Sequence, residues 1–401
     1  MNIVKQILKF NASRESERLA LKYRNMRGDP FIFLRATCHL FYARLPMEPI
    51  MRKAPAAWAC GDLHLENFGS YKGDNRQVYF DLNDFDEALL APLTWDPVRG
   101  LASILVGGST LHPDPSVPLH LCDVFLDAYA RTLADGKPRW VERETAVPPV
   151  SELLQAVRLR ARPDFLDSRT ERLGRRRRIR IDGRKALAAS AQQKAAVRDF
   201  IQAFAVQQPA PRFFDVLDVA RRIAGNGSLG VDRYMVLVRG KGSPDANYLL
   251  DLKQALPASP QPRDPLAQPA WADEAQRVIT VQRRMQAIAM AFLHPVQMNG
   301  QPYVLRALQP SEDRVALGSS GVRHPIARLE HLMTVMAQCL GWAQLRASGR
   351  SGSANADALI DFTRGAKWRR QLMEVARHCA AEVESDWKVY TAAYDQGAFN
   401  L

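Results

Sequence analysis

The chain is poor in lysine, has few cysteines and lacks any long apolar segment. Only 12 of its 55 basic residues are lysine, so its positive charge is carried mainly by arginine. No apolar run approaches the roughly 20 residues that a membrane-spanning helix requires. The opening segment MNIVKQILKF lacks the apolar core and cleavage site of a signal peptide. The cysteines form no CxxC pair, which argues against a disulfide framework or zinc ribbon; they are Cys38, Cys60, Cys122, Cys339 and Cys379. We expect a reduced, cytoplasmic protein with no membrane span.

The overall composition is that of a folded globular protein. Hydrophobic residues make up 47% and charged residues 24% of the 401 positions, which excludes wholesale disorder. The formal net charge is +13. Because an arginine side chain matches a phosphate group bidentately, this excess suits nucleotides, nucleic acids or phosphorylated substrates. A genome rich in arginine codons would give the same excess, so charge alone does not choose a function.

Changes of pattern along the chain indicate a mixed α and β architecture. Apolar residues at three-to-four spacing predict helices in 97–136. Strand periodicity follows over 213–256, and a Pro- and Ala-rich surface loop is expected at 255–271. The remainder, from about 272, is mostly helical and contains a short strand pair near 293–308.

Two polar segments near the start of the chain are candidates for chemistry. The first reads CGDLHLENFG (60–69), a hairpin is predicted over 70–80, and DLNDFD (81–86) follows it. Such a concentration of Asp, His and Asn is more polar than a turn requires. Carboxylates also cap helices and turns, which is the simpler explanation for any one of them.

The order of these side chains is that of a phosphoryl-transfer enzyme. Such an enzyme needs a carboxylate that orients the attacking hydroxyl, and an Asn and a second Asp that hold magnesium. Asp62, Asn67 and Asp84 occur in this order. Asp81 competes with Asp84 for the metal role, and the 12-residue step from Asp84 to Asp96 favours Asp84. A metallophosphoesterase is the rival interpretation, but the other histidines form no GNH-type ligand group.

The second candidate site is GNGSLG at 225–230. Strand-like segments flank it on both sides, whereas a dinucleotide-binding turn would open a helix. Strand, glycine loop and strand is the arrangement in which a kinase covers the nucleotide phosphates with backbone. An ordinary hairpin with a glycine-rich turn is the alternative. The nucleotide contacts would come from Gly225, Asn226, Gly227, Ser228 and Gly230.

A lysine ends the next predicted strand, YLLDLK. This residue, Lys253, stands where a kinase places the lysine that pairs with the phosphates. A kinase orients that lysine with a Glu on the following helix. Glu274 in the predicted helix 272–292 is the candidate, and Gln282 is an alternative partner. Acidic residues are also common in a first helical turn because they favour the helix dipole.

These motifs occur in an unusual order. A kinase-like chain places the glycine loop before the catalytic loop, whereas here the glycine loop comes second. A circular permutation accommodates both in an α+β, protein-kinase-like two-lobe fold. Such a permutation is physically tolerable when the chain termini lie close together. Residues 1–200 would begin a mostly helical large lobe, 201–312 would form a small β-rich nucleotide-covering lobe, and 313–401 would complete the large lobe.

Two resemblances bear on this interpretation. GDLHLEN resembles the catalytic loop of aminoglycoside phosphotransferases, whose motif reads HGDxHxxN, with Cys60 in place of the first His. DFD (84–86) resembles their metal-binding segment. WDPVRGLA (95–102) resembles the segment in which an Asp opens a helix and braces the catalytic loop. This resemblance implies that Asp62 and His64 are catalytic.

The chain also resembles, along nearly its full length, the bacterial family called domain of unknown function 2252. The matching stretches are PFIFLR (30–35), CGDLHLENFG, FDLNDFDEA, GNGSLG and QRRMQ (282–286). Membership implies a kinase-like fold and supplies no substrate.

A run of basic residues from Arg172 to Lys185 is the third feature. Such a run could neutralise several phosphates of a nucleic acid. Its alternation at 179–181 and the Asp-Gly turn signal at 182–183 favour a solvated two-stranded ribbon. A basic rim that receives an anionic substrate is the functional alternative.

The leading hypothesis is a phosphotransferase that uses ATP and Mg²⁺ to modify an unknown hydroxyl-bearing acceptor, for which an anionic character is one option. The rival from another class is a pseudokinase, a nucleotide-binding or scaffold module without catalysis. A nucleic-acid-binding protein is the third and less favoured hypothesis. Nucleotidyl rather than phosphoryl transfer also stays open.

Overall fold

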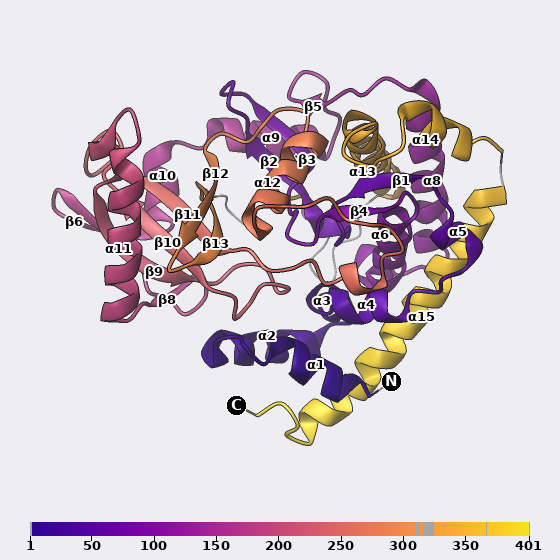
Figure 1. Cartoon of the computed structure of the whole chain (residues 1–401), viewed down its shortest axis with the longest axis horizontal. Helices are drawn as coiled ribbons and strands as arrows, with labels where there is room; N and C mark the ends of the chain where they lie inside the picture. Colours follow the sequence, from indigo (N-terminus) through magenta and orange to yellow (C-terminus); the bar gives the residue numbers. More distant parts are fainter. Residues whose placement is uncertain (1, 309–312, 316, 318–324, 366, 401) are drawn as a thin grey trace.

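The computed structural model describes residues 2–308, 313–315, 317, 325–365 and 367–400 (Figure 1). Its helices are α1 (Ile3–Asn11), α2 (Ser16–Gly28), α3 (Pro30–Ala36), α4 (Cys38–Arg44), α5 (Pro49–Arg52), α6 (Trp95–Val106), α7 (Gly108–Leu111), α8 (Val117–Asp135), α9 (Val150–Leu159), α10 (Arg162–Asp167), α11 (Ala191–Val206), α12 (Glu274–Met285), α13 (Ile326–Ala347), α14 (Ala356–Phe362) and α15 (Lys367–Asp395). Its strands are β1 (Ala56–Ala59), β2 (Phe68–Lys72), β3 (Val78–Leu82), β4 (Leu89–Pro92), β5 (Val141–Glu142), β6 (Thr170–Leu173), β7 (Arg176–Ile179), β8 (Ala186–Ala188), β9 (Val216–Arg222), β10 (Arg233–Val238), β11 (Tyr248–Gln254), β12 (Leu293–Met298) and β13 (Gln301–Ala307). The expected α+β class is confirmed.

The largest sheet has six antiparallel strands in the order β12-β13-β11-β10-β9-β8. Successive side chains of a strand point to opposite faces of the sheet. Along β10, Tyr234 and Val236 pack in the cluster that contains α11. Met235 and Leu237 pack on the other face with the buried Leu166 of α10. Both faces of the sheet are therefore covered, and α11 runs along one of them at the left of Figure 1.

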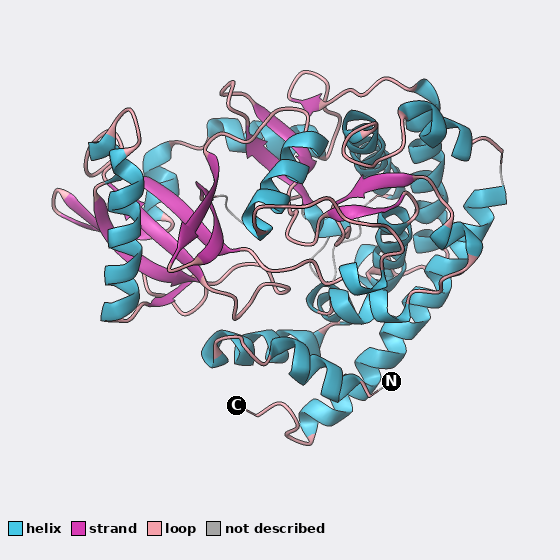
Figure 2. Cartoon of the chain, in the orientation of Figure 1, coloured by secondary structure: helices cyan, strands magenta, loops and turns pink. Residues whose placement is uncertain are grey.

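Long helices form the other part of the molecule (Figure 2). α8 packs along α13, and α6 packs against α15. The buried residues Leu332, Met336 and Leu340 recur at four-residue spacing and give α13 an apolar stripe. α8 and α13 approach closely at Gly341, where a Cβ atom would lie 2.8 Å from Cγ2 of Thr132. A larger residue at this position would push the two helices apart.

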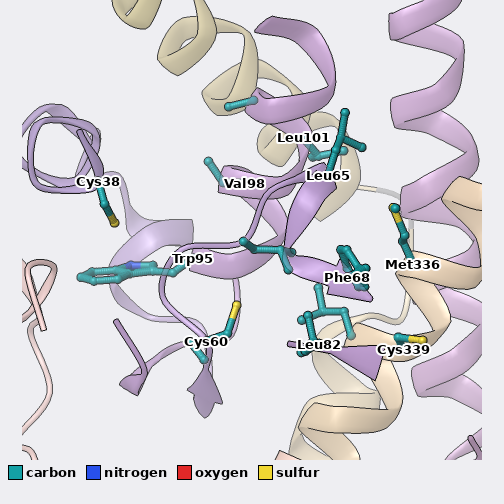
Figure 3. Close-up of a cluster of buried hydrophobic side chains, with 14 of the residues drawn as sticks. Cys38, Cys60, Leu65, Phe68, Leu82, Trp95, Val98, Leu101, Met336 and Cys339 are labelled. Carbon is teal, nitrogen blue, oxygen red and sulfur yellow. The ribbon is translucent and has the colours of Figure 1, made fainter. Parts of the chain in front are cut away.

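Two small sheets, β1–β4 and β2–β3–β5, adjoin this helical body. Figure 3 shows part of the apolar cluster that holds them, with Trp95 of α6, Phe68 of β2, Leu82 of β3 and Met336 of α13. The hairpin expected over 70–80 is confirmed as β2 and β3. The polar segments 60–67 and 83–88 connect β1 to β2 and β3 to β4, so one core positions both of them.

The division into units differs in detail from the expected one. Residue 200 lies inside α11, whose Val197 and Ile201 pack on the six-stranded sheet. The β-rich unit therefore begins earlier and includes β8 as its edge strand. α12, expected within the small lobe, contributes Val278 and Ile279 to the larger core. The second expected boundary, at 312–313, adjoins residues 309–312, which lie outside the described residues.

The basic run forms a ribbon, as one of the two interpretations predicted, but its turn lies elsewhere. β6 and β7 pair between Thr170 and Ile179, so the chain reverses at residues 174–175 rather than at 182–183. Asp182 accepts hydrogen bonds from the backbone of residues 184–186 and shapes a separate turn into β8. Arg177 is buried and pairs with Asp167 and Asp245, so part of the run is structural.

Two expectations about the whole chain can be compared with the structure. Among the described residues, no helix combines the length and the apolar character that a membrane-spanning helix needs. The five cysteines are all buried as free thiols.

Candidate functional site

A cleft lies where the loops of the helical body face the six-stranded sheet. Its empty volume is about 760 Å³ when the open solvent at its mouth is included. The cleft draws on seven separate stretches of chain. Its polar and charged lining residues include Arg14, Arg35, Asp62, His64, Glu66, Asn67, Asp84, Asp86, Glu87, Asn226, Ser228, Lys253, Gln254 and Arg314. Gly225 and Gly227 also line it. Segments that are more than 150 residues apart in sequence thus share one cavity.

The loop 60–67 is held in shape by the first turn of α6. Asp96 accepts hydrogen bonds from the backbone N–H of Cys60 (2.8 Å) and of Gly61 (3.0 Å). Burial raises the pKa of Asp96 to about 6. Gly61 has φ +79°, and a Cβ atom there would lie 1.9 Å from the carbonyl oxygen of Glu87. Only glycine fits this crossing of the two polar segments.

Asp62 is joined to a buried arginine. Arg99 of α6 donates from Nε to Asp62 Oδ1 at 2.7 Å, and its Nη2 also donates to the carbonyl of Leu34 at 3.1 Å. Burial raises the pKa of Asp62, and the charge of Arg99 opposes that rise. About a fifth of the Asp62 side chain stays exposed, which leaves it open to a ligand in the cleft.

Asn67 ties the two polar segments together. Its Nδ2 donates to the carbonyls of Asp62 and Asp84, both at 3.1 Å, and its Oδ1 accepts from Asp84 N at 2.7 Å. Burial alone would raise the pKa of Asp84, but the charges of Lys253 and Arg306 outweigh it and the pKa is lowered. Asp84 is therefore an anion beside the Asn67 amide, whose oxygen also accepts from the backbone N–H of Asn83 at 3.4 Å.

His64 is a neutral, buried imidazole. Its Nδ1 accepts from the backbone N–H of Glu66 at 3.1 Å, so the ring proton lies on Nε2. Burial lowers the pKa of His64 well below its usual value, and the charges of Arg35 and Arg314 lower it further. The ring lines the cleft as a hydrogen-bond donor without charge.

The glycine loop joins β9 to β10, as the strand–loop–strand pattern predicted. Gly225 and Gly230 have φ +72° and +86°, a conformation that disfavours residues with a Cβ atom. Gly230 lies beyond the residues that line the cleft, against the turn between α1 and α2. Its carbonyl accepts from the backbone N–H of Glu15 at 2.9 Å.

The N-terminal helices hold this loop from outside. Arg14 donates to the carbonyls of Gly227 (2.6 Å) and Leu229 (2.9 Å), and Lys22 lies 3.3 Å from the same Gly227 oxygen. Asn25 donates to the side chain of Asn226. Burial lowers the pKa of Arg14 to about 10. These hydrogen bonds hold the loop through its carbonyl groups and the Asn226 side chain. They do not involve its backbone N–H groups.

Lys253 of β11 enters the cleft from the sheet side. Its Nζ pairs with Asp86, which follows Asp84 in the acidic segment. The expected partner Glu274 instead accepts from Arg277 Nε at 2.5 Å and does not line the cleft. Gln282 donates to Gln286 at 3.1 Å. Glu274 is therefore paired within its own helix, and Lys253 is paired with Asp86 instead.

Asp81 also lies away from the cleft. It is buried, and its Oδ2 accepts from Arg346 (3.0 Å) and from the N–H of Ala287 (3.2 Å). Burial raises its pKa. These contacts tie β3 to α13 and to the end of α12, so Asp81 has a structural position, whereas Asp84 faces the cleft.

Sequence reasoning missed several cleft residues, namely Arg14, Arg35, Glu66, Glu87 and Arg314. Arg35 ends the PFIFLR stretch, which carried a family resemblance but no assigned role. Glu66 and Glu87 lie within the two polar motif stretches but received no role there, and Arg14 and Arg314 stand in segments without a motif. Only the tertiary arrangement brings them to the cleft.

The cleft offers oxygen atoms that suit magnesium. In the described part of the chain, no three His, Cys, Asp or Glu side chains converge as a metal site. Magnesium does not require such a cage, because it is commonly bound by one or two carboxylates together with substrate phosphates and waters. Asp84 and the oxygen of Asn67 are hard donors of the right kind, and Asp84 forms no ion pair within the described residues. The donor set therefore fits magnesium bound together with a nucleotide.

Comparison with known proteins gives one match. The family model described as "Uncharacterized protein conserved in bacteria (DUF2252)" matches residues 14–393. The chain belongs to this family. The DUF2252 match spans both walls of the cleft, from Arg14 to Arg314. No curated protein and no solved structure matches the chain.

Proposed function

We propose that this DUF2252 protein is an ATP- and Mg²⁺-dependent phosphotransferase of kinase-like fold that acts on a hydroxyl-bearing acceptor. One observation carries the proposal: Asp62, Asn67 and Asp84 face the glycine loop and Lys253 across a single cleft. The residue types needed for phosphoryl transfer are a carboxylate base, magnesium ligands, a phosphate-binding lysine and backbone donors. All of them reach this cleft from its two walls.

The order of elements in the β-rich unit supports a kinase-like arrangement. The glycine loop joins the first two long strands, Lys253 lies on the third, and a helix and two further strands follow. This is the sequence of parts that covers and binds ATP phosphates in kinases. The catalytic loop precedes the unit in the chain, which a circular permutation explains.

The positions of the termini support such a permutation. α1 packs against α15, and the rings of Tyr23 and Phe399 lie 4.8 Å apart. Arg27 of α2 forms two hydrogen bonds of 3.0 Å with Asp395 at the end of α15. Both chain ends lie along the lower edge of the molecule in Figure 1.

In the proposed reaction, Asp62 orients the acceptor hydroxyl and accepts its proton. A bond forms between the acceptor oxygen and the γ-phosphorus, the bond from that phosphorus to the β–γ bridging oxygen breaks, and ADP leaves. Asp84 and Asn67 would hold magnesium, which supplies charge neutralisation of the phosphates. Lys253 would exchange Asp86 for phosphate oxygens, and the N–H groups of residues 225–228 would cover them.

The direct test is Asp62→Asn in the full-length protein. Loss of the base should lower γ-phosphate transfer or slow hydrolysis by about 10²–10⁴-fold. Nucleotide affinity should change little, because Asn retains an acceptor for Arg99. The exposed Asp74→Asn on the β2–β3 turn is the matched control and should behave as wild type. Full activity of Asp62→Asn would refute the assignment.

A pseudokinase is the second candidate, and two contacts favour it. Lys253 is already paired with Asp86, and both ends of the Asn67 amide bond to backbone. A module that only binds nucleotide would keep these contacts and release no γ-phosphate. Measurement of Mg²⁺-dependent γ-phosphate release from ATP by the purified protein separates the two candidates.

A further inference from the structure

The cleft contains a second charged group that the proposed reaction does not use. It consists of Arg35 at the end of α3, Glu66 in the catalytic loop and Arg314. Arg35 Nη1 lies 2.7 Å from Glu66 Oε2, and Arg314 Nη1 lies 3.1 Å from the same oxygen. Two guanidinium groups thus share one carboxylate oxygen, and the charges of Asp62 and Asp29 also act on Arg35.

Arg35 is held in a state that favours a further anionic partner. The residue is 9% exposed, and its Nε is buried without a hydrogen-bond partner among the described residues. Burial lowers the pKa of Arg35, and the charge of Arg314 acts in the same direction against the attraction of Glu66. A buried donor with no acceptor costs free energy, which a ligand oxygen would recover.

The position of this group separates it from the phosphate-binding wall. Glu66 lies between His64 and Asn67 in the catalytic loop, and the charge of Arg35 acts on the ionisation of Asp62. The tip of the glycine loop lies directly above, since a Cβ atom at Gly227 would be 3.1 Å from the Arg35 carbonyl. Lys253 and the glycine-loop backbone come from the sheet side of the same cleft. Arg35 and Arg314 therefore border the point where acceptor and terminal phosphate would meet.

We propose that the acceptor carries an acidic group, a carboxylate or a phosphate, and that Arg35 and Arg314 bind this group beside Asp62. The inference rests on the proposed phosphotransfer and adds the chemical class of its acceptor. Planar guanidinium groups bind carboxylate and phosphate oxygens bidentately, and both arginines line the cleft. On binding, the ligand would take over from Glu66, which is one-third exposed and can turn toward solvent.

Inorganic phosphate serves as the probe, because the acceptor itself is unidentified. Its binding to full-length protein is measured by calorimetry, first alone, then with saturating Mg²⁺ and ADP, and then with Mg²⁺ and a non-hydrolysable ATP analogue. Phosphate should still bind the protein that holds the ATP analogue. Arg35→Gln and Arg314→Gln should each weaken it by at least about tenfold.

Three variants make the result specific. Arg35→Lys keeps the positive charge but loses the planar guanidinium group that donates bidentately. It should therefore bind phosphate more tightly than Arg35→Gln but more weakly than wild type. Arg314 is more exposed than Arg35, so Arg314→Gln keeps the test valid should Arg35→Gln fail to fold. The exposed Arg364→Gln on the far helical body should bind phosphate as wild type does.

Two outcomes overturn the inference. Phosphate that binds with ADP but is excluded by the ATP analogue would assign Arg35 to the terminal phosphate of the nucleotide rather than to the acceptor. Phosphate affinity that is absent at millimolar concentration, or unchanged by both glutamine variants, would remove the subsite altogether. Failure of the nucleotides to bind at all would instead refute the proposed phosphotransfer, which the calorimetry records separately.

Discussion

His64 shows at the level of one residue how burial sets protonation in this cleft. The unfolded chain binds a proton at this histidine below pH about 6.5, whereas the folded protein does not, because burial lowers the pKa of His64. The stability that this difference contributes is present above pH about 6.5 and is lost as the pH falls.

His64→Asn should remove this pH dependence. Asn can still accept the Glu66 N–H as an N-cap, but it does not titrate. Between pH 6.5 and pH 5, wild type should therefore lose about 2 kcal/mol more unfolding free energy than the variant does. Urea unfolding of both proteins at the two pH values measures this difference. His39, which is also buried with a lowered pKa, is common to both proteins and cancels. Equal losses in wild type and variant would mean that His64 titrates normally.

Gly61 is the residue on whose backbone conformation the loop 60–67 depends most. Gly61→Ala adds a Cβ at φ +79° and 1.9 Å from a carbonyl oxygen, so we expect a loss of at least about 3 kcal/mol of stability. Gly174 in the β6–β7 turn has φ +59° with nothing within 4 Å, and Gly174→Ala should cost only about 1 kcal/mol. Denaturant melts of the two variants provide the comparison. Equal losses of unfolding free energy in the two variants would show that the backbone where the two polar segments cross can shift to accommodate a Cβ atom.

At the level of elements, the N-terminal helices are the least expected part of the site. No motif marks this part of the sequence, yet Arg14, Glu15 and Lys22 donate hydrogen bonds to three carbonyl groups of the glycine loop region. Glycine residues give a loop many accessible backbone conformations, and these hydrogen bonds restrict the loop to one of them.

Arg14→Ala should therefore loosen the glycine loop. We expect nucleotide binding to weaken by about tenfold, because the ligand must then order the loop itself. Amide hydrogen exchange at residues 225–230 should become faster. Arg24→Ala, an exposed position on α2, should leave both measurements unchanged. Unchanged exchange in Arg14→Ala would indicate that the loop is rigid without the helices.

The sequence indicated most of the local structure because each element has a local signal. The hairpin at 70–80, the strands around GNGSLG and the strand that carries Lys253 follow from alternation and turn residues. The partner of Lys253 could not be predicted in this way. Glu274 is the expected partner because it lies close to Lys253 in the sequence. The observed partner, Asp86, is 167 residues away in the sequence and is brought to Lys253 by the tertiary fold.

Asp81 illustrates a second limit of sequence reasoning. Asp81 and Asp84 differ by three positions in one acidic segment, and both are candidates for a metal ligand on composition alone. Asp81 is the fourth residue of β3, where its side chain turns to Arg346 of α13, whereas Asp84 follows the end of the strand. The 12-residue step to Asp96 favours Asp84 for the cleft, but it does not show that Asp81 meets the buried Arg346.

For the whole molecule, the proposal requires that the two walls of the cleft bind one nucleotide. An acyl-phosphate derivative of ATP transfers its acyl group to a lysine amine that lies close to the bound phosphates. Treatment of the full-length protein with this reagent, followed by mass spectrometry of the peptides, locates that lysine. We predict acylation of Lys253, protection of that residue by Mg²⁺-ATP, and loss of the protection in Asp84→Asn. Acylation confined to other lysines, or labelling of Lys253 that Mg²⁺-ATP does not reduce, would contradict a shared ATP site.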